Sequence, residues 1–489
     1  MLVPLSIEDS RKLLAFFQNA GYSEVNIKKQ LRPAELPSRR LRNEARLMDR
    51  TAEPTLLNTL LRWFWIGLAL DKSQVADIVP EEMLRLMTDC GLLELADGIL
   101  TAKAMLVPTV DFLVAADHPK AIERGESEMV LWPNPTSKFL ANFSIRRHSG
   151  ATLDLGTGSG ILSLGASKFS DTVVGTDLNP RASSFVQFNA RLNGIENIEA
   201  LTGDRFAPVK DRRFDLILTN PPFFITPRQG YLFCENELEL DELCRRIVKE
   251  APAYLNEGGY LEMLCEWAQV AGQPWEERIA EWVRGIGCDA WVMKGMTQDP
   301  AEYAQRRIAE ITENPGDDAR LFDGYMAYYR ELQVEAIHDG VIVLRKRDGD
   351  NWIRIEEVPK TASGDMGETI LATFAARDIL LKLQDDAALL AARPRLSEFA
   401  RLEQVCMPSN GCWAAESINL RLTRGFPFQL KVQPLVADFL ATCDGNRTAE
   451  EAIRAFAAVA NAPVEIVQRE SLAMMRTLID RGYMVIREP

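Results

Sequence analysis

Hydrophobic and polar positions alternate with two different periods in the middle of the chain. Between about residues 125 and 348, short apolar runs typical of buried strands are separated by segments with helical periodicity. Such alternation predicts an α/β domain with a mostly parallel sheet and helices on both faces. The expected strands are residues 151–155, 173–177, 214–219, 260–266, 290–294 and 341–345.

The beginning of the chain has a different pattern, which predicts helices followed by a β-hairpin. Ser6 and Asp9 have the spacing of a helix N-terminus, and the apolar segment 56–70 is expected to be a buried helix. An Asp-Gly pair at residues 97–98 predicts a tight turn between two short strands. This helical N-terminal domain, residues 1–124, resembles a winged helix, which occurs in DNA-binding domains and in packing modules alike.

The last region begins after a polar, glycine-containing stretch at residues 347–367, which is expected to be a linker. Thr448 and Glu451 have the spacing of a capping box, and they predict one long helix that runs up to a short final strand. Residues 349–489 are therefore expected to form a C-terminal domain. Its part from about residue 400 to 489 also resembles a winged-helix module.

A glycine-rich turn follows the first expected strand of the central region. Residues 153–160 read LDLGTGSG, so a buried strand leads through a run with three glycines into a helix. Glycine allows the sharp backbone turn and lets a ligand approach more closely than side chains would allow. Nucleotide-binding folds of several classes share such a turn. The motif therefore indicates a ligand of that kind without identifying it.

Two carboxylates stand where this ligand would need them. Asp177 ends the second strand, 23 residues after Asp154, and an acid there can accept hydrogen bonds from both hydroxyls of a ribose. As an alternative, Asp177 could cap the helix that begins after Asn179. Asp204 precedes the next expected strand, where it can accept from an adenine amino group while Phe206 lies against the ring.

The most specific motif is Asn220-Pro221-Pro222-Phe223, which follows the strand at residues 214–219. Together with the glycine-rich turn and the two carboxylates, in this order, it resembles class I S-adenosylmethionine-dependent methyltransferases. The resemblance is to the branch that methylates amino groups on planar, conjugated systems. In that branch, Asp/Asn-Pro-Pro-Tyr/Phe occurs in adenine-N6, guanine-N2 and glutamine-amide methyltransferases, the last acting on release factors.

The resemblance covers about residues 130–345 and implies a Rossmann-like, mostly parallel sheet of seven strands. Residues 237–303 look like a group of predicted bacterial methyltransferases with extra flanking domains. The cofactor that the resemblance implies is S-adenosyl-L-methionine. Carried over to this chain, the residues that bind it are Asp154, Gly156, Thr157, Gly158, Gly160, Asp177, Leu178, Asp204, Arg205, Phe206 and Asn220.

The roles implied for the motif concern a substrate nitrogen whose lone pair is delocalised and therefore poorly nucleophilic. By the resemblance, the Asn220 side-chain oxygen and the Pro221 carbonyl accept its two N–H groups, and proline geometry at Pro222 limits their motion. Phe223 stacks on the planar group. Asparagine at the head of the motif is compatible with both RNA-base and glutamine methylation. Tyr231 could line the substrate pocket or only pack.

The charge pattern bears on the substrate. The chain has a net charge of −14, which excludes a generally basic nucleic-acid coat protein. Eight basic residues nevertheless fall between residues 28 and 50. They form either a solvated helix face or a patch that contacts phosphates. The residues considered for phosphate contacts are Lys28, Arg39, Arg40 and Arg42.

Three functions stay open on the sequence. The leading hypothesis is an N-methyltransferase for adenine N6 or guanine N2 in ribosomal or transfer RNA, because flanking domains can hold a large target while the base enters the pocket. The alternative is methylation of a glutamine amide in a protein such as a translation release factor, which suits an acidic chain better. The third is a cofactor-binding regulatory protein that has lost methyl transfer, and the intact Asn-Pro-Pro-Phe motif argues against it.

Composition argues against several other classes of protein. Eight cysteines form no CxxC pair and only three histidines occur, which disfavours a zinc site and a disulfide framework. No apolar run reaches the roughly 18 residues that a membrane span needs. The N-terminus has no pattern of a secretory signal. These features favour a protein of the reducing cytoplasm.

Overall fold

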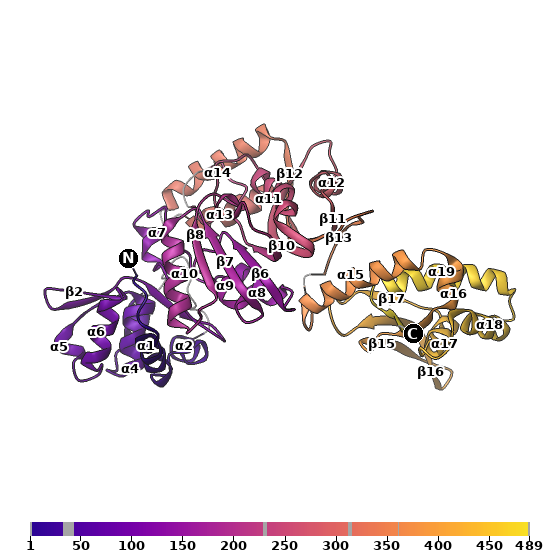
Figure 1. Cartoon of the computed structure of the whole chain (residues 1–489), viewed down its shortest axis with the longest axis horizontal. Helices are drawn as coiled ribbons and strands as arrows, with labels where there is room; N and C mark the ends of the chain where they lie inside the picture. Colours follow the sequence, from indigo (N-terminus) through magenta and orange to yellow (C-terminus); the bar gives the residue numbers. More distant parts are fainter. Residues whose placement is uncertain (1, 33–43, 228–231, 312–314, 360, 488–489) are drawn as a thin grey trace. The chain divides into compact units, whose positions relative to one another are not determined.

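The computed structural model describes residues 2–32, 44–227, 232–311, 315–359 and 361–487 (Figure 1). It divides into two compact units, one formed by Met1–Ala141 with Arg147–Glu357 and the other by Asn142–Arg146 with Val358–Pro489. Residue 124, the expected end of the N-terminal domain, lies within the first unit. The expected domain boundaries stay a prediction.

The N-terminal part of the first unit is helical and carries two small antiparallel sheets. Its three-stranded sheet has the order β1-β3-β2 and contains the expected hairpin, and β4 pairs with β5. Winged-helix geometry stays a prediction. The elements are α1 (Ile7–Asn19), α2 (Glu24–Leu31), α3 (Glu44–Arg50), α4 (Leu56–Leu61), β1 (Ala69–Asp71), α5 (Lys72–Val75), α6 (Glu81–Asp89), β2 (Leu93–Ala96), β3 (Ile99–Ala102), β4 (Met105–Pro108), β5 (Leu113–Ala116) and α7 (Lys120–Glu123).

The apolar segment 56–70 is not one helix as expected. After α4 the chain continues as one π-helical turn, Arg62–Ile66, and stops at Gly67, whose φ of 72° is left-handed. A side chain at Gly67 would come within 2.9 Å of the His118 ring, so this stop needs glycine for space as well as for backbone conformation. The buried tryptophans Trp63 and Trp65 confirm that the segment belongs to the core.

An eight-stranded sheet forms the centre of the first unit, with the order β13-β11-β12-β10-β9-β6-β7-β8. The pairs from β8 to β10 are parallel, and β12 runs antiparallel to both of its neighbours. The prediction of a mostly parallel sheet is confirmed. The strands are β6 (Ser149–Leu155), β7 (Ser170–Asp177), β8 (Ile198–Thr202), β9 (Phe214–Thr219), β10 (Leu255–Val270), β11 (Cys288–Gln298), β12 (Val334–Lys346) and β13 (Ile353–Glu357).

The expected number of strands, seven, is wrong by one. β13 lies inside the polar stretch 347–367 that the sequence suggested as a linker, and it pairs in parallel with β11 at the edge of the sheet. Its Arg354 guanidinium lies over the Trp291 ring, 5.1 Å from the ring centroid. Edge strands need only one apolar face, and polar side chains can pack on aromatic rings. For that reason the strand had no apolar run to reveal it.

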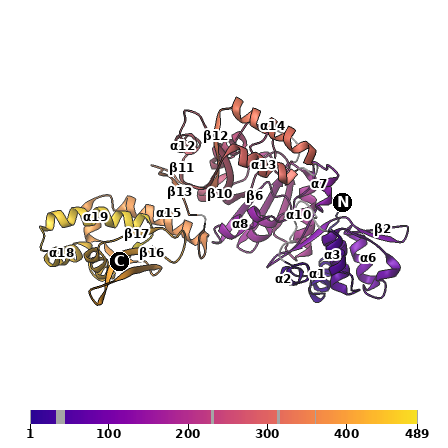
Figure 2. The same ribbon diagram turned by 180° about the vertical axis from the view of Figure 1, so that it is seen from behind.

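Helices cover both faces of this sheet (Figures 1 and 2). Leu153 and Leu155 of β6 share a core with α11 and α12, whereas Asp154 between them bonds to Ser163 of α9 on the opposite face. The helices of this part are α8 (Pro135–Phe143), α9 (Ile161–Ala166), α10 (Pro180–Leu192), α11 (Glu242–Glu250), α12 (Trp275–Val283), α13 (Pro300–Ile311) and α14 (Pro315–Glu331).

The second unit has its own core of apolar residues and two small sheets, β15-β16-β17 and β14-β18. The capping box of Thr448 and Glu451 is confirmed, but the expected single long helix is two helices, because Asn461 adopts a left-handed φ of 51° and Pro463 follows. The elements are α15 (Met366–Lys382), α16 (Asp386–Ala391), β14 (Arg393–Leu396), β15 (Ala400–Ser409), β16 (Cys412–Leu422), β17 (Gln429–Lys431), α17 (Pro434–Thr442), α18 (Ala449–Ala460), α19 (Val464–Asp480) and β18 (Met484–Arg487).

Candidate active site

A cavity of about 470 Å³ lies in the first unit at the carboxyl ends of β6, β7 and β9. Parallel strands that end at one edge of a sheet place their following loops side by side, which is where ligands bind in α/β folds. The expected site residues that line it are Gly156, Thr157, Gly158, Asp177, Leu178, Asp204, Arg205, Asn220, Pro221 and Pro222. Those that do not line it are Asp154, Gly160, Phe206 and Phe223.

The glycine-rich loop presents backbone to this cavity. Gly156 and Gly158 have φ values of 75° and 54°, a region that disfavours residues with a Cβ atom. A Cβ built on either glycine would meet nothing within 4 Å, because the space beside both glycines is open. A ligand can therefore lie directly against this stretch of main chain.

Asp154 holds the glycine-rich loop through hydrogen bonds from the side away from the cavity lining, since it does not line the cavity itself. Its Oδ2 accepts hydrogen bonds from the Thr157 hydroxyl at 2.7 Å and from the Ser163 backbone N–H and hydroxyl at 2.9 and 2.6 Å. Burial raises the pKa of the Asp154 carboxyl to about 6, and the hydrogen bonds to its oxygen oppose that rise. Asp154 thus joins the end of β6 to the start of α9 and orders the loop between them.

Gly160 is needed for packing, which a stability measurement can test. Its φ is 85°, and an added Cβ would lie 3.0 Å from Val186 Cγ2 on α10. Gly194 is a matched control, since its φ is 70° and no atom lies within 4 Å of its added Cβ. We expect Gly194→Ala to lower the free energy of unfolding by roughly 1–2 kcal/mol, the left-handed penalty alone. Gly160→Ala should lower it further in urea denaturation, and equal losses would show that Val186 simply moves aside.

Asp177 faces the cavity with both carboxylate oxygens already ordered by main chain. Oδ2 accepts from the Gly158 N–H at 2.9 Å, and Oδ1 accepts from the Asn179 N–H at 2.9 Å. Burial raises the pKa of the Asp177 carboxyl, and these two hydrogen bonds oppose the rise. The N-cap of α10 is Asn179, whose Oδ1 accepts from the Arg181 N–H, so the helix-cap alternative for Asp177 is wrong.

The segment expected to contact adenine divides into two parts. Asp204 is exposed at the cavity, with its carboxylate 3.3 Å from the Arg205 guanidinium. Phe206, by contrast, is only 2% exposed, and its ring stacks on Tyr254 at a centroid distance of 4.3 Å. Arg205 has a left-handed φ of 43°. The structure therefore places the Phe206 ring in the core under the sheet and not beside the cavity, in contrast to the expectation.

Three residues of the Asn-Pro-Pro-Phe segment, Asn220, Pro221 and Pro222, line the cavity directly after β9. The Asn220 Nδ2 donates to Thr136 Oγ1 at 3.4 Å, and the Thr136 hydroxyl donates to Asn134 Oδ1 at 2.7 Å. Because the single hydroxyl proton of Thr136 is used on Asn134, its oxygen acts as an acceptor for Asn220. This chain of bonds favours the amide orientation in which Nδ2 faces Thr136, and it leaves Oδ1 as the amide atom that can accept a hydrogen bond from a ligand.

Residues that the sequence analysis did not single out hold this segment. Asn236 Nδ2 donates to the Pro222 carbonyl at 2.8 Å, and Asn236 itself lines the cavity. Phe223 is half-buried and packs against the core of the sheet. Asn134 caps the start of α8 by accepting from the Ser137 N–H, a pattern that its spacing from Ser137 could have revealed.

Part of the cavity wall comes from residues 129–132, which follow the N-terminal helices and hairpins. Asn189 of α10 and Asn193, the residue that caps the C-terminus of α10, pair with the backbone of β5. Asn189 accepts from the Ala115 N–H and donates to the carbonyls of Ala115 and Ser159, and Asn193 accepts from the Leu113 N–H and donates to its carbonyl. The N-terminal part is thereby bonded to the glycine-rich loop.

The basic patch is described only in part. Lys28 forms an ion pair with Glu24 one turn earlier, at 2.7 Å, which is the geometry of a solvated helix face. Arg39, Arg40 and Arg42 lie outside the described residues, as does Tyr231.

The remaining expectations concern metals, thiols and membranes. All eight cysteines are free. In the described part of the chain no group of His, Cys, Asp or Glu could hold a metal ion. Within the same residues, no helix combines the length and the apolar character needed to cross a membrane.

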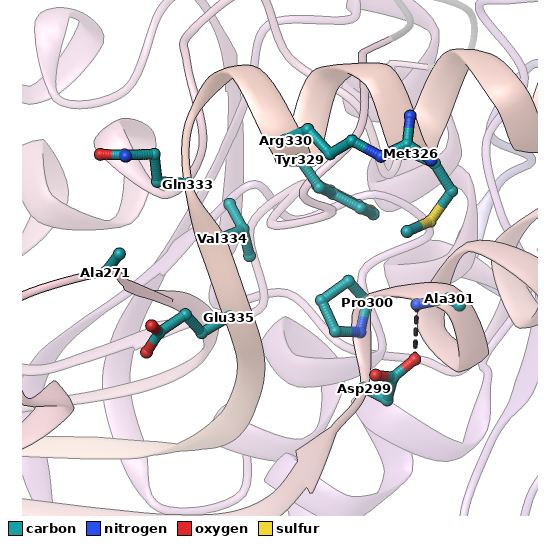
Figure 3. Close-up of a pocket in the computed structure, with 10 residues that line it drawn as sticks. All are labelled: Ala271, Asp299, Pro300, Ala301, Met326, Tyr329, Arg330, Gln333, Val334 and Glu335. Carbon is teal, nitrogen blue, oxygen red and sulfur yellow. Dashed lines mark hydrogen bonds between the residues drawn. The ribbon is translucent and has the colours of Figure 1, made fainter.

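A second cavity of about 370 Å³ is lined by the end of α14, the start of α13 and the start of β12 (Figure 3). Arg330 and Tyr329 come from α14, and Asp299 accepts from the Ala301 N–H at the start of α13. Asp299 is thus used as a helix cap, and none of the expected site residues lines this cavity.

Comparisons with known proteins agree with the geometry of the first cavity. Residues 134–277 match the methyltransferase small domain, and residues 372–486 match a domain of unknown function, DUF7782. A Methanocaldococcus jannaschii protein named for protein N5-glutamine methyltransferase activity is 30% identical over 154 residues, which are 30% of this chain and 73% of that protein. The chain belongs to the methyltransferase small domain family.

Two other relatives match over a smaller share of their own length. The release factor glutamine methyltransferase of Geobacter sulfurreducens is 36% identical over 34% of this chain and 62% of its own length. The ribosomal RNA small subunit methyltransferase C of Alcanivorax borkumensis is 30% identical over 24% of this chain and 32% of its own length. The resemblance drawn from the sequence motifs is confirmed, and the methyltransferase match ends before β11.

Proposed function

We propose that the protein is an S-adenosylmethionine-dependent N-methyltransferase that acts on a planar amino nitrogen of a macromolecule. The observation that carries this proposal is the orientation of Asn220. Its amide nitrogen is engaged by Thr136, so its oxygen is the acceptor at the cavity that the glycine-rich loop and Asp177 also line. A regulatory protein without methyl transfer would not need this acceptor.

The lining of the cavity fits S-adenosylmethionine. Gly156 and Gly158 leave open space beside their backbone, and Asp177 has acceptor capacity left for ribose hydroxyls after its two backbone bonds. The cofactor has a net positive charge, and when bound it supplies an electrophilic methyl group with a good leaving group. Carboxylates outnumber guanidinium groups in the lining, which suits a positively charged ligand. The charged lining residues are Asp177, Asp204, Glu235, Glu237, Arg205 and Arg246.

The chain's own contribution to the reaction is positioning and electrostatics. Asn220 Oδ1 and the Pro221 carbonyl accept the two N–H groups of the substrate, which directs the nitrogen lone pair away from the conjugated system. The same oxygens stabilise the positive charge that develops on nitrogen. Because the acceptors are held before the substrate arrives, little reorganisation is needed. Stacking by Phe223 stays a prediction that requires its half-buried ring to turn toward the cavity.

Two substrate classes remain in the proposal. An exocyclic amine of adenine or guanine in ribosomal or transfer RNA is supported by the ribosomal RNA relative and by the basic residues 28–50. A glutamine amide in a release factor or another protein is supported by the glutamine methyltransferase relatives. The carboxylates Glu235 and Glu237 at the cavity support it too, because they would repel a phosphate backbone. In either case we propose a cytoplasmic site of action.

A labelling experiment separates the two classes. The protein is incubated with tritium-labelled cofactor and a gently prepared lysate of a strain that lacks the gene, and Asn220→Ala serves as the inactive control. Label that ribonuclease releases and protease does not would support the RNA class, and the reverse would support the glutamine class. In the RNA case, reversing the charge of Arg39, Arg40 and Arg42 should weaken RNA binding. It should also make the slope of log affinity against log salt concentration less steep, by nearly one for each phosphate contact that is lost. Absence of label together with absence of cofactor binding would refute the proposed function.

A further inference from the structure

The backbone that follows the Asn-Pro-Pro-Phe motif is held by tyrosines from a distant part of the chain. The Ile225 N–H donates to the Tyr303 hydroxyl at 3.1 Å, and the Ile225 carbonyl accepts from the Tyr329 hydroxyl at 2.8 Å. Next to it, the Thr226 hydroxyl donates to the Tyr325 hydroxyl at 3.0 Å. The three tyrosines are on α13 and α14, two helices that are in contact with each other and that connect β11 to its neighbouring strand β12 along the chain (Figures 1 and 2).

A buried ion pair orders the tyrosine that receives the Ile225 N–H. Tyr303 donates its hydroxyl proton to Glu266 Oε2 at 2.5 Å, which leaves the hydroxyl oxygen as an acceptor. Arg307 binds the other carboxylate oxygen at 2.5 Å, and its guanidinium lies 3.3 Å from the centroid of the Phe224 ring. Glu266 and Arg307 are 3% and 6% exposed. The ion pair therefore acts on the loop at two points, through Tyr303 and through Phe224.

The local sequence explains why external support is needed. Pro221 and Pro222 have no N–H group, so neither can donate a backbone hydrogen bond that would tie this part of the loop to its surroundings. Its neighbours are instead bonded to other elements: the Pro222 carbonyl accepts from Asn236, and the Phe224 N–H donates to the Cys234 carbonyl. Together with the two hydrogen bonds at Ile225, these bonds hold the backbone at Pro222, Phe224 and Ile225.

Buried charges and hydroxyls of this kind are poorly explained by stability alone. A buried ion pair costs desolvation energy and is often replaced by apolar residues without loss of stability. Here its hydrogen bonds lead to the backbone of one loop, two residues after Phe223. Burial raises the pKa of the Tyr303 hydroxyl, and the nearby Arg307 opposes that rise.

We propose that five residues, the loop clamp, position the Asn-Pro-Pro-Phe segment so that its two acceptor oxygens stay directed into the cavity. They act through the loop and are positioning residues. The inference deepens the proposed function, on which its effect on turnover rests. The residues of the loop clamp are Glu266, Tyr303, Arg307, Tyr325 and Tyr329.

The test removes single hydroxyls from the full chain. Tyr329→Phe loses only the bond to the Ile225 carbonyl, and Tyr303→Phe also loses a bond to Glu266. The matched control is Tyr483→Phe, because Tyr483 is buried in the second unit and also donates to a backbone carbonyl, that of Phe428, at 2.6 Å. For each protein we would measure amide hydrogen exchange of the 221–226 peptide, titration of S-adenosylhomocysteine, thermal unfolding and the initial rate of tritium transfer into the lysate.

We expect both loop-clamp variants to speed hydrogen exchange in the 221–226 peptide and to slow transfer roughly 10- to 100-fold, as for a displacement of about 1 Å at a reacting group. Affinity for S-adenosylhomocysteine should stay within about twofold, since Asp177 and the glycine-rich loop are untouched. Tyr483→Phe should change thermal unfolding only. If Tyr303→Phe fails to fold, Tyr329→Phe alone tests the loop clamp.

Unchanged exchange in the 221–226 peptide of Tyr329→Phe would overturn the loop clamp. So would a transfer rate per folded molecule equal to that of Tyr483→Phe. Failure of the proposed function gives a different result: the unaltered protein would neither bind the cofactor product nor transfer label, while hydrogen exchange would still decide whether the tyrosines hold the loop.

Discussion

Asn220→Ala is expected to lower turnover by roughly 100-fold or more, the scale for loss of one preorganised electrostatic partner. Affinity for S-adenosylmethionine should stay within a few-fold, because the glycine-rich loop and Asp177 are unchanged. Calorimetric titration of the cofactor and the saturated rate of label transfer measure the two quantities separately. The assignment of Asn220 is wrong if cofactor binding is lost while the saturated rate is kept.

Two further variants test how Asn220 works. Asn220→Asp keeps an acceptor oxygen, and the Thr136 hydroxyl can turn to donate to it, so this variant should retain more turnover than Asn220→Ala. Thr136→Val removes the group that orients the amide, whereas Thr136→Ser keeps it. The rate should therefore fall in Thr136→Val and recover in Thr136→Ser. Equal rates in both would show that the amide orientation does not depend on Thr136.

Asp177→Ala is expected to weaken cofactor binding by roughly 1–3 kcal/mol, the usual cost of losing hydrogen bonds to a charged group. The loss of affinity has two sources. The ribose loses its acceptor, and the glycine-rich loop loses the hydrogen bond from the Gly158 N–H to Asp177 that orders it. Calorimetric titration with S-adenosylmethionine and with its demethylated product measures the change.

A matched control for Asp177→Ala lies on the same strand. Asp171, at the other end of β7, is exposed and bonds to His148. Asp171→Ala removes a carboxylate of the same charge from the same unit, so it should leave cofactor affinity unchanged. A loss of affinity as large in Asp171→Ala as in Asp177→Ala would mean that net charge, and not contact with the ribose, is responsible.

The parts of the site that the sequence predicted are those fixed by local chemistry. Glycines with left-handed φ at Gly156 and Gly158 and a carboxylate at the end of β7 follow from strand–turn–helix rules. Parallel strands then bring these loops to the same edge as Asn220. The sequence did not predict that the Phe206 ring points into the core. Its direction depends on the left-handed backbone of Arg205 and on stacking with Tyr254, and the local sequence indicates neither.

The supports of the site come from long-range contacts that no local pattern encodes. Thr136 lies 84 residues before Asn220, and Tyr329 lies 104 residues after Ile225. The same limit applies to the fold: β13 has one polar face at the edge of the sheet, so its residues looked like a linker. Tertiary packing overrides local preference at such edges.

The pairing of α10 with β5 has a consequence for how this chain can change in evolution. Recombination that replaced the N-terminal region would have to supply a strand edge at the same place. Otherwise the fully buried Asn189 amide would lose both of its hydrogen bonds to Ala115 and keep only the one to Ser159, at a cost of roughly 1–3 kcal/mol per unpaired group. The N-terminal region and α10 should therefore be inherited together, and related chains that keep β5 should also keep asparagine at positions 189 and 193.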